Sequence, residues 1–330
     1  MKKLLTPVQI GKVQLDNRLV FPPLASGKSD DNGHVSQELL DYYDEKTKGG
    51  LLQLIIIEHS YVNMQGKASS RQASLAEDSC VEGFSRLADL IHKNGSKVVV
   101  QLNHAGSVSA NDTGFPVISP SALEHPWEKG RIPRPMTTEE IHDVANDFVQ
   151  AAIRAQKAGL DGVEVHSAHT YLLNQFYSPL GNQRTDEYGG TLENRLRLHV
   201  EIIKAIRAAT GPDFLLVVRL GACDYIDGGN TIQDGVKAAK ILVDAGIDIV
   251  DVSGGFCASQ HPTSKEPGYF SDSSAAIKAE VNVPVILTGG VVTALQAEEL
   301  LERGVADMIG VGRAVLQDSD WAKKEIATLS

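Results

Sequence analysis

Two histidines and a tyrosine lie within a stretch of six residues, at His166, His169 and Tyr171. They directly follow a mostly apolar run, Gly162–Val165, which has the composition of a buried strand. Imidazoles can donate hydrogen bonds to a substrate oxygen that gains negative charge, and a phenol can supply a proton. The group therefore indicates hydrogen-bond donors for a substrate oxygen, with a proton donor beside them.

Two other interpretations of these histidines remain open. Glu164 lies on the same strand face as His166, so a zinc site is conceivable. No other residues supply a convincing set of further ligands, and the cysteines Cys80, Cys223 and Cys257 lie far apart without metal-ligand spacing. Alternatively, one of the histidines simply bonds the backbone of a tight loop.

Glycines occur at the ends of the last two apolar runs, as Gly289–Gly290 and as Gly312–Arg313. Backbone N–H groups can close around a phosphate only where no side chain intervenes. Each pair alone is equally consistent with an ordinary tight turn. Because both fall where barrel enzymes commonly bind phosphate, together they predict a phosphate site.

Eight short apolar runs must position these residues, and several of the runs are rich in β-branched side chains. Runs of this kind are typical of parallel strands that are buried on both faces. They are Leu19–Pro23, Leu51–Glu58, Lys97–Leu102, Gly162–His166, Leu215–Leu220, Ile249–Gly254, Val283–Gly290 and Asp307–Arg313. Helical patterns separate them, one of which begins at a Ser36 cap and another at a capping box around Thr137 or Thr138.

This alternation predicts an α/β fold of the (β/α)8 TIM-barrel type, with a doubly wound open sheet as the main alternative. The active site of such a barrel lies at the carboxyl ends of its strands. In this chain those ends carry Leu24–Ala25, Glu58–His59, Gln101–His104, His166 with His169 and Tyr171, Arg219, Gly254–Gly255, Gly289–Gly290 and Gly312–Arg313.

Two segments lie outside the repeating pattern. Val8–Arg18 resembles a short hairpin that closes the bottom of the barrel. Ser107–Pro135 is long, proline-rich and weakly periodic, so we expect a lid after the third strand, because long insertions of this kind usually cover or bind a ligand. No linker, repeat or low-complexity tract divides the chain, and residues 1–330 are expected to form one domain.

The composition excludes several classes of protein. The 330 residues carry a formal net charge of -11, which does not favour nucleic acid, because binding phosphate backbones needs clustered Lys and Arg. No window approaches the length of apolar sequence that a membrane span needs. The N-terminus lacks the apolar core of a signal peptide, so the expected location is cytoplasmic.

Motifs along nearly the whole chain, from about Asn17 to about Asp320, resemble the Old Yellow Enzyme family of FMN-dependent ene-reductases. They are NRLVFPPLA, LIIIEHS, VVQLNHAG, EVHSAHTYLLNQFYSPLGNQRTDEYGG, VVRLGA, VILTGG and GVGRA. The central motif is long and specific, although its end, Arg184–Gly190, is interpreted as an ordered loop that leads to the next helix. The resemblance implies a TIM barrel with FMN at its mouth.

The resemblance also implies roles for individual residues. Leu24 and Ala25 would lie behind the flavin, and His59 or its backbone would face the edge of the ring. Gln101 and Arg219 would bond the pyrimidine edge. The phosphate would be held by Gly289, Gly290, Gly312 and Arg313.

On the substrate side, the resemblance implies that His166 and His169 clamp the carbonyl oxygen of an α,β-unsaturated compound. Tyr171 would deliver a proton to the α-carbon. NADH or NADPH would visit the flavin, reduce it and leave, since the chain has no GxGxxG unit for a permanently bound nicotinamide.

The chain departs from the family pattern in several places. Ala25 stands where one bacterial subgroup has a cysteine that tunes the flavin, and the aromatic residue that often follows is missing. The chain ends at Ser330 without the arginine that reaches a neighbouring subunit in many relatives, which leaves open whether the subunits of a homo-oligomer would share active sites. The cysteine cluster and second dinucleotide domain of larger relatives are also missing.

The sequence therefore predicts an FMN-dependent NAD(P)H oxidoreductase that reduces the C=C bond of small activated alkenes. Two alternatives belong to other classes. One is a flavin-free barrel enzyme acting on a phosphorylated metabolite, although no Schiff-base lysine or acid–base carboxylate pair is evident at the strand ends. The other is a flavin-binding protein without turnover.

Overall fold

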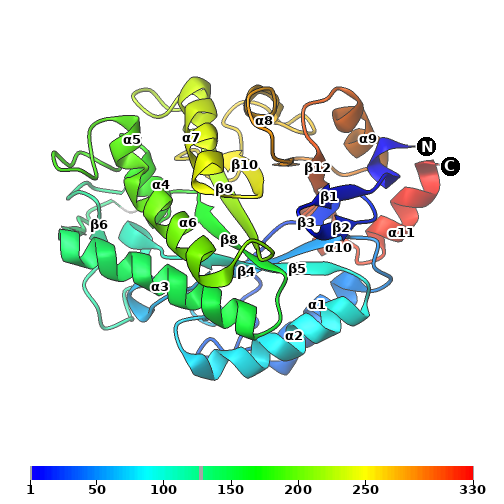
Figure 1. The fold of residues 1–330 in the computed structure, drawn as a ribbon, viewed down its shortest axis with the longest axis horizontal. Coiled ribbons are helices and arrows are strands. Elements are labelled where there is room, and N and C mark those ends of the chain that lie inside the picture. The colour runs from blue at the N-terminus through cyan, green and yellow to red at the C-terminus, as the bar shows by residue number, and fades with distance from the viewer. Residues whose placement is uncertain (1, 126–128, 330) are drawn as a thin grey trace.

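Eight parallel strands close into a barrel in the computed structural model, which describes residues 2–125 and 129–329 (Figure 1). The strands follow one another around the barrel in the order β10-β11-β12-β3-β4-β5-β8-β9. They are β3 (Leu19–Phe21), β4 (Leu54–Tyr61), β5 (Lys97–Asn103), β8 (Gly162–Ser167), β9 (Leu215–Cys223), β10 (Ile249–Gly254), β11 (Val285–Thr288) and β12 (Met308–Gly310). The prediction of a (β/α)8 barrel is confirmed, and the alternative of an open doubly wound sheet is wrong.

Helices lie around the outside of the barrel, where they cover the outer faces of the strands (Figure 1). They are α1 (Gln37–Thr47), α2 (Val81–Lys93), α3 (Thr138–Lys157), α4 (Leu172–Tyr177), α5 (Leu192–Arg195), α6 (Arg197–Thr210), α7 (Ile232–Ala245), α8 (Ser271–Lys278), α9 (Ala294–Glu302), α10 (Arg313–Gln317) and α11 (Trp321–Ile326). The predicted caps are confirmed: Ser36 accepts from the N–H of Leu39, and Thr137 forms a capping box with Glu140.

The lower part of the barrel interior is apolar, and we call it the barrel floor. Its buried side chains pack into one cluster that is separate from the main core between strands and helices. The cluster contains Ile10, Leu15, Val20, Leu54, Ile56, Val99, Leu215, Val217, Ile249, Ile286 and Met308. Ile10 and Leu15 come from a hairpin of β1 (Val8–Ile10) and β2 (Val13–Leu15), so the prediction that this segment closes the barrel bottom is confirmed.

The upper part of the barrel interior is polar. Successive side chains of a strand point to opposite faces, so the residue two positions beyond a floor residue also points inward. Applied to β5, β9, β10 and β11, this rule leads from Val99, Val217, Ile249 and Ile286 to the next inward residues. We define the polar layer as these four residues and Glu164 of β8, that is Gln101, Glu164, Arg219, Asp251 and Thr288.

The segment predicted as a lid extends from the third barrel strand to α3. It contains the 3-10 turn Gly106–Val108 and a small pair of strands, β6 (Ile118–Ser119) and β7 (Arg134–Pro135). Residues 126–128 of the predicted lid lie outside the described part of the chain.

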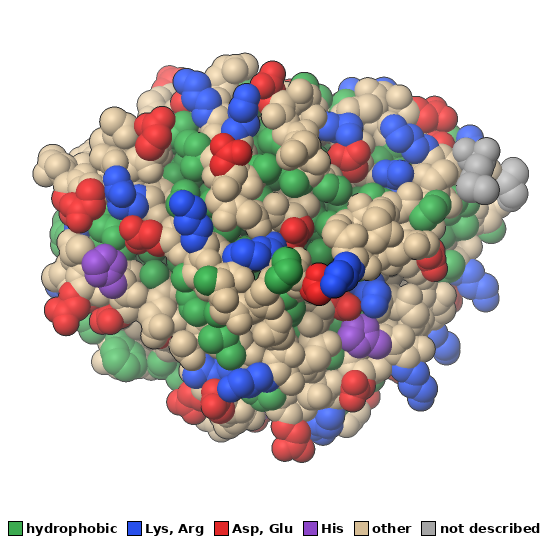
Figure 2. Space-filling model, viewed as in Figure 1, with side chains coloured by type: hydrophobic (Ala, Val, Ile, Leu, Met, Phe, Trp, Pro, Cys, Tyr) green, Lys and Arg blue, Asp and Glu red, His purple; other side chains and the backbone are tan. Residues whose placement is uncertain are grey.

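The molecular surface carries charges of both signs. On the face seen in Figure 2, acidic and basic side chains are interspersed over the helices. Within residues 2–125 and 129–329, no helix has the length and apolar character needed to cross a membrane.

Candidate active site

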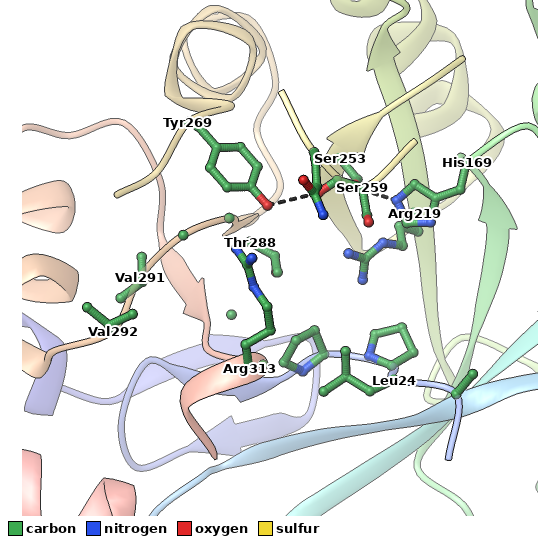
Figure 3. Close-up of a pocket in the computed structure, with 18 residues that line it drawn as sticks. Leu24, His169, Arg219, Ser253, Ser259, Tyr269, Thr288, Val291, Val292 and Arg313 are labelled. Atoms are coloured by element: carbon green, nitrogen blue, oxygen red, sulfur yellow. Dashed lines mark hydrogen bonds between the residues drawn. The ribbon is translucent and has the colours of Figure 1, made fainter. Parts of the chain in front are cut away.

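A cavity of about 260 Å³ opens at the carboxyl ends of the strands (Figure 3). Seven of the residues predicted to hold the cofactor line it, together with His169. These seven are Leu24, Ala25, Arg219, Gly289, Gly290, Gly312 and Arg313. They come from segments that are far apart in the sequence, and the closed barrel brings them together.

Arg219 projects from β9 into this cavity and is only 4% exposed. Its Nη1 donates to Asp251 Oδ2 over 2.8 Å, while its Nε is buried and has no partner. The hydroxyl of Thr288, on the neighbouring wall, is also buried without a partner. Buried polar groups are normally hydrogen-bonded, so these two atoms mark places where a ligand is expected to bond.

The other end of the cavity is bounded by glycines and by Arg313, whose side chain points into the cavity in Figure 3. A Cβ at Gly289 would come within 2.7 Å of the Tyr269 ring, and one at Gly290 within 2.9 Å. Gly290 also has a φ of 71°, which favours glycine. Glycine is therefore needed at both positions, because the Tyr269 ring packs directly against this backbone. The same backbone lines the cavity beside Arg313, whose guanidinium is suited to a phosphate.

The end of β8 and the loop that follows it bring His166, His169 and Tyr171 together. The centroid of the His166 ring lies 5.1 Å from the centroid of the His169 ring and 5.1 Å from that of the Tyr171 ring. His169 and Thr170 adopt positive φ angles of 57° and 64°, which is unusual for a residue that is not glycine and strained for a β-branched one. The side chain of Asn174 accepts from the Thr170 N–H at 2.8 Å and helps to hold this turn.

Burial keeps all three side chains uncharged. It lowers the pKa of His166 and of His169 well below the usual value, and the positive charge of Arg219 adds to this for both. Burial also raises the pKa of Tyr171 above 10. At neutral pH the loop therefore presents two neutral imidazoles and a protonated phenol. His166 Nδ1 is buried without a partner, and His169 Nε2 lies 2.7 Å from Ser253 Oγ.

A second cavity, of about 550 Å³, adjoins the first, and His169 and Ser259 line both. Tyr171 lines it from the β8 loop, and Val108 and His125 line it from the predicted lid. The lid prediction thus falls on a segment that borders the histidines and the tyrosine.

Gln101 and His59 were also predicted to contact the cofactor, but neither of them lines this cavity. The Gln101 side chain donates to Glu164 Oε1 at 2.7 Å. His59 packs against Tyr171, with ring centroids 5.5 Å apart, and its Nδ1 accepts from the side-chain amides of Gln72 and Asn103. Burial lowers the pKa of His59 to about 4, so this ring is neutral and carries its proton on Nε2.

The sequence interpretation missed several lining residues. Ser253, Thr288, Ser259 and Tyr269 contribute hydroxyl groups to the cavity wall. Ser253 and Thr288 continue the inward alternation of β10 and β11, which is a signal that the sequence contained. Ser259 and Tyr269 lie in the irregular loop after β10, where no periodicity marks them; Tyr269 donates to the Ser259 carbonyl at 2.8 Å.

In the described part of the chain, no group of three or more His, Cys, Asp or Glu side chains is arranged to hold a metal ion.

The residues present fit the FMN that the sequence resemblance implies. FMN has a flat ring with polar edges and a terminal phosphate. The unpartnered Arg219 Nε and Thr288 hydroxyl match a polar ring edge, and Leu24 and Ala25 provide an apolar wall. Arg313 and the glycines that line the cavity beside it match the phosphate.

Comparison with known proteins agrees with this geometry. Residues 3–328 match the model of a family described as NADH:flavin oxidoreductase / NADH oxidase. The chain is 39% identical over 324 residues to an NADH oxidase from Thermoanaerobacter brockii, and the match covers 96% of this chain and 49% of that protein. The chain thus spans about half the length of this relative.

Two further proteins match over nearly their full lengths. An NADPH dehydrogenase from Halalkalibacterium halodurans is 37% identical over 324 residues, which cover 98% of this chain and 93% of that one. Among solved structures, an old yellow enzyme homologue from Zymomonas mobilis superposes with a TM-score of 0.86 at 27% identity, covering 99% of this chain and 93% of that chain.

Proposed function

Because the chain belongs to the NADH:flavin oxidoreductase / NADH oxidase family, we propose that it uses FMN and NADH or NADPH to reduce the C=C bond of α,β-unsaturated carbonyl compounds. The resemblance to Old Yellow Enzyme is confirmed by the structural match to a homologue of that enzyme. The observation that carries the proposal is the grouping of His166, His169 and Tyr171 beside a cavity that fits FMN.

Arg219, Thr288, Arg313 and the glycines of the cavity would hold the cofactor. FMN, when bound, would supply the two-electron hydride chemistry of the reaction. Leu24 and Ala25 would exclude water from one face of the ring, and the cavity beside Tyr171 would admit the small alkene.

His166 and His169 would bind the substrate carbonyl oxygen. As a hydride reaches the β-carbon of such a substrate, negative charge moves onto this oxygen, and aimed N–H donors stabilise it. Neutral imidazoles suit this role, because each has one N–H to donate and the low pKa values keep both rings neutral. Ser253 would hold the ring of His169 through its 2.7 Å hydrogen bond.

Tyr171 would deliver the proton to the α-carbon. Its raised pKa keeps the phenol protonated between turnovers, and its position on the strained turn between β8 and α4 places it beside His166. The cytoplasmic location stays a prediction.

The first experiment is to add FMN to the protein, follow quenching of flavin fluorescence, and then add p-hydroxybenzaldehyde. We expect tight FMN binding and a long-wavelength absorbance band from the phenolate stacked on the flavin. A protein that ignores FMN would remove the proposal. His166→Ala with His169→Ala should keep FMN but lose the band, and should lower enone turnover by about 10²-fold or more per donor.

The role of Tyr171 has its own test by stopped-flow kinetics. Tyr171→Phe should slow oxidation of the reduced enzyme by an enone about 10²- to 10⁴-fold and leave reduction by NAD(P)H unchanged. Tyr177→Phe is the matched control, because Tyr177 is fully buried on α4, packs against His199 and lines neither cavity. Equal slowing of both half-reactions in Tyr171→Phe would show that Tyr171 is not a dedicated acid.

A further inference from the structure

Two carboxyl groups lie side by side in the polar layer beneath the cavity. Glu164 of β8 and Asp251 of β10 are both 0% exposed. Strand register places Gln101 opposite Glu164 and Arg219 opposite Asp251. The side chains then bond in these same pairs, because Gln101 Nε2 donates to Glu164 Oε1 at 2.7 Å and Arg219 Nη1 donates to Asp251 Oδ2 at 2.8 Å.

The charges of this group do not balance if both acids are ionised. Arg219 is a permanent cation and forms the ion pair with Asp251. Gln101 is neutral, and His166, two residues beyond Glu164 on β8, is kept neutral by burial. One cation would then face two buried carboxylates, and an uncompensated buried charge is strongly destabilising.

Each of the two carboxyl groups also has one oxygen without a hydrogen bond. Glu164 Oε2 and Asp251 Oδ1 are buried, and neither has an N–H or O–H donor among the described residues. The two carboxyl groups lie within hydrogen-bond reach of one another. A single proton between them would satisfy both oxygens and remove the excess negative charge.

We propose that Glu164 is a protonated acid at neutral pH, that its hydroxyl donates to Asp251 Oδ1, and that the two residues together orient Arg219 toward the cavity. Glu164 and Asp251 are thus positioning residues. Asp251 holds one nitrogen of the guanidinium, and Glu164 holds Asp251, which leaves Arg219 Nε free to bond a cofactor.

Burial supports Glu164 as the holder of the proton. It raises the pKa of Glu164 well above its usual value, and the negative charge of Asp251 raises it further, while Arg219 opposes this. The pKa of Asp251 is raised by burial too, but Arg219 and the hydrogen bond with Glu164 lower it. The proton therefore belongs on Glu164.

Infrared spectroscopy of the protein without added flavin tests the proton directly. The C=O band of a protonated carboxylic acid should be present at neutral pH, persist at about pH 9, and disappear in Glu164→Gln. Glu58→Gln is the matched control. Burial raises the pKa of Glu58 to about 7, so the band that this substitution removes should be one that fades in the unmodified protein as the pH rises through 7. A spectrum in which Glu164→Gln removes a carboxylate band instead would overturn the proposal.

FMN affinity tests whether Glu164 and Asp251 orient Arg219. This experiment, unlike the infrared one, rests on the proposed function. In Glu164→Gln the amide can still accept from Gln101 and donate to Asp251, so the dissociation constants of oxidised and reduced FMN should each stay within about threefold of the unmodified protein. Adding Asp251→Asn to Glu164→Gln removes both carboxyl groups of the pair and leaves Arg219 uncompensated, so the double variant should favour reduced FMN by about tenfold, which equals about 30 mV for a two-electron couple.

A shift in Glu164→Gln as large as that in the double variant would mean that Glu164 is ionised in the unmodified protein, and would overturn the proposal. If the protein binds no FMN at all, the proposed function fails while the infrared result still decides where the proton lies. If the double variant does not fold, the Glu164→Gln affinities and the infrared spectra carry the decision.

Discussion

The barrel floor and the polar layer share four strands, β5, β9, β10 and β11, on which they lie two residues apart, and they differ in almost every physical respect. The floor is apolar, fully buried and closed below by the hairpin that contributes Ile10 and Leu15. The polar layer contains an ion pair, two carboxyl groups and side-chain atoms without partners. The floor therefore stabilises the barrel, whereas the polar layer carries groups that a bound ligand or a shared proton would satisfy.

This difference shows how the same strands contribute both to the stability of the barrel and to the binding of a ligand. Residues at the bottom need only be apolar and of the right volume. Residues two positions higher must match a ligand and one another, so each depends on a partner from another strand. Pairs of substitutions on a single strand can separate the two kinds of contribution.

The largest effect is expected at Arg219 of β9. Arg219→Met should weaken FMN binding about 10- to 100-fold, because a hydrogen bond to a charged group contributes about 1.5–3 kcal/mol. It should also lower the free energy of unfolding by about 3–5 kcal/mol, because Asp251 loses its partner in a buried ion pair. Flavin fluorescence titration and urea unfolding measure the two quantities.

Val217→Ala is the control from the floor of the same strand. It should lower the free energy of unfolding by about 2 kcal/mol through lost packing and leave the FMN dissociation constant unchanged. If Val217→Ala weakened FMN as much as Arg219→Met, the two layers would not be functionally separate.

Much of the barrel was predictable from the sequence, because buried parallel strands need continuous apolar runs. The run Ile249–Gly254 coincides with β10, and the other predicted strands differ from the observed ones by a few residues at their ends. The hairpin and the helix caps at Ser36 and Thr137 could also be predicted, because each depends only on residues that are close together in the sequence.

The candidate site was predictable only in part. Residues in the strand-end glycine pairs and the histidine loop can be found from their position alone, and the structure places the glycine pairs at the cavity. The partnership of Glu164 with Asp251 could not be found, because it depends on strand register around the closed barrel. Ser259 and Tyr269 could not be found either, since an irregular loop has no period to follow.

A smaller effect, dependent on pH, is expected at Glu58 of β4, two residues beyond Ile56 of the floor. Burial raises its pKa from 4.5 to about 7, while the Ser26 N–H, which bonds Glu58 Oε2 at 3.1 Å, opposes this. The folded state thus binds the proton more tightly than the unfolded chain. The stabilisation is complete below pH 4.5 and is lost as the pH rises through about 7, by up to about 3 kcal/mol.

Urea unfolding of the unmodified protein and of Glu58→Gln at a series of pH values checks this prediction. The difference between their free energies of unfolding should change between pH 4.5 and about 7 and stay constant above pH 7. Ile56→Val should instead cost about 0.5–1.5 kcal/mol at every pH, because the floor does not titrate. A pH-independent difference for Glu58→Gln would place the Glu58 pKa near its ordinary value.

The smallest effect is expected at Thr288 of β11, two residues beyond Ile286. Its hydroxyl is buried without a partner, and a buried polar group without a hydrogen bond costs about 1–3 kcal/mol. Thr288→Val keeps the shape and removes the hydroxyl, so it should raise the free energy of unfolding of the flavin-free protein by about 1 kcal/mol and weaken FMN severalfold. Ile286→Val in the floor should instead lower stability and leave FMN affinity unchanged. Opposite signs of the two stability changes would show that the polar layer trades stability for a ligand contact; a loss of stability in Thr288→Val would mean that this hydroxyl is already satisfied without a ligand.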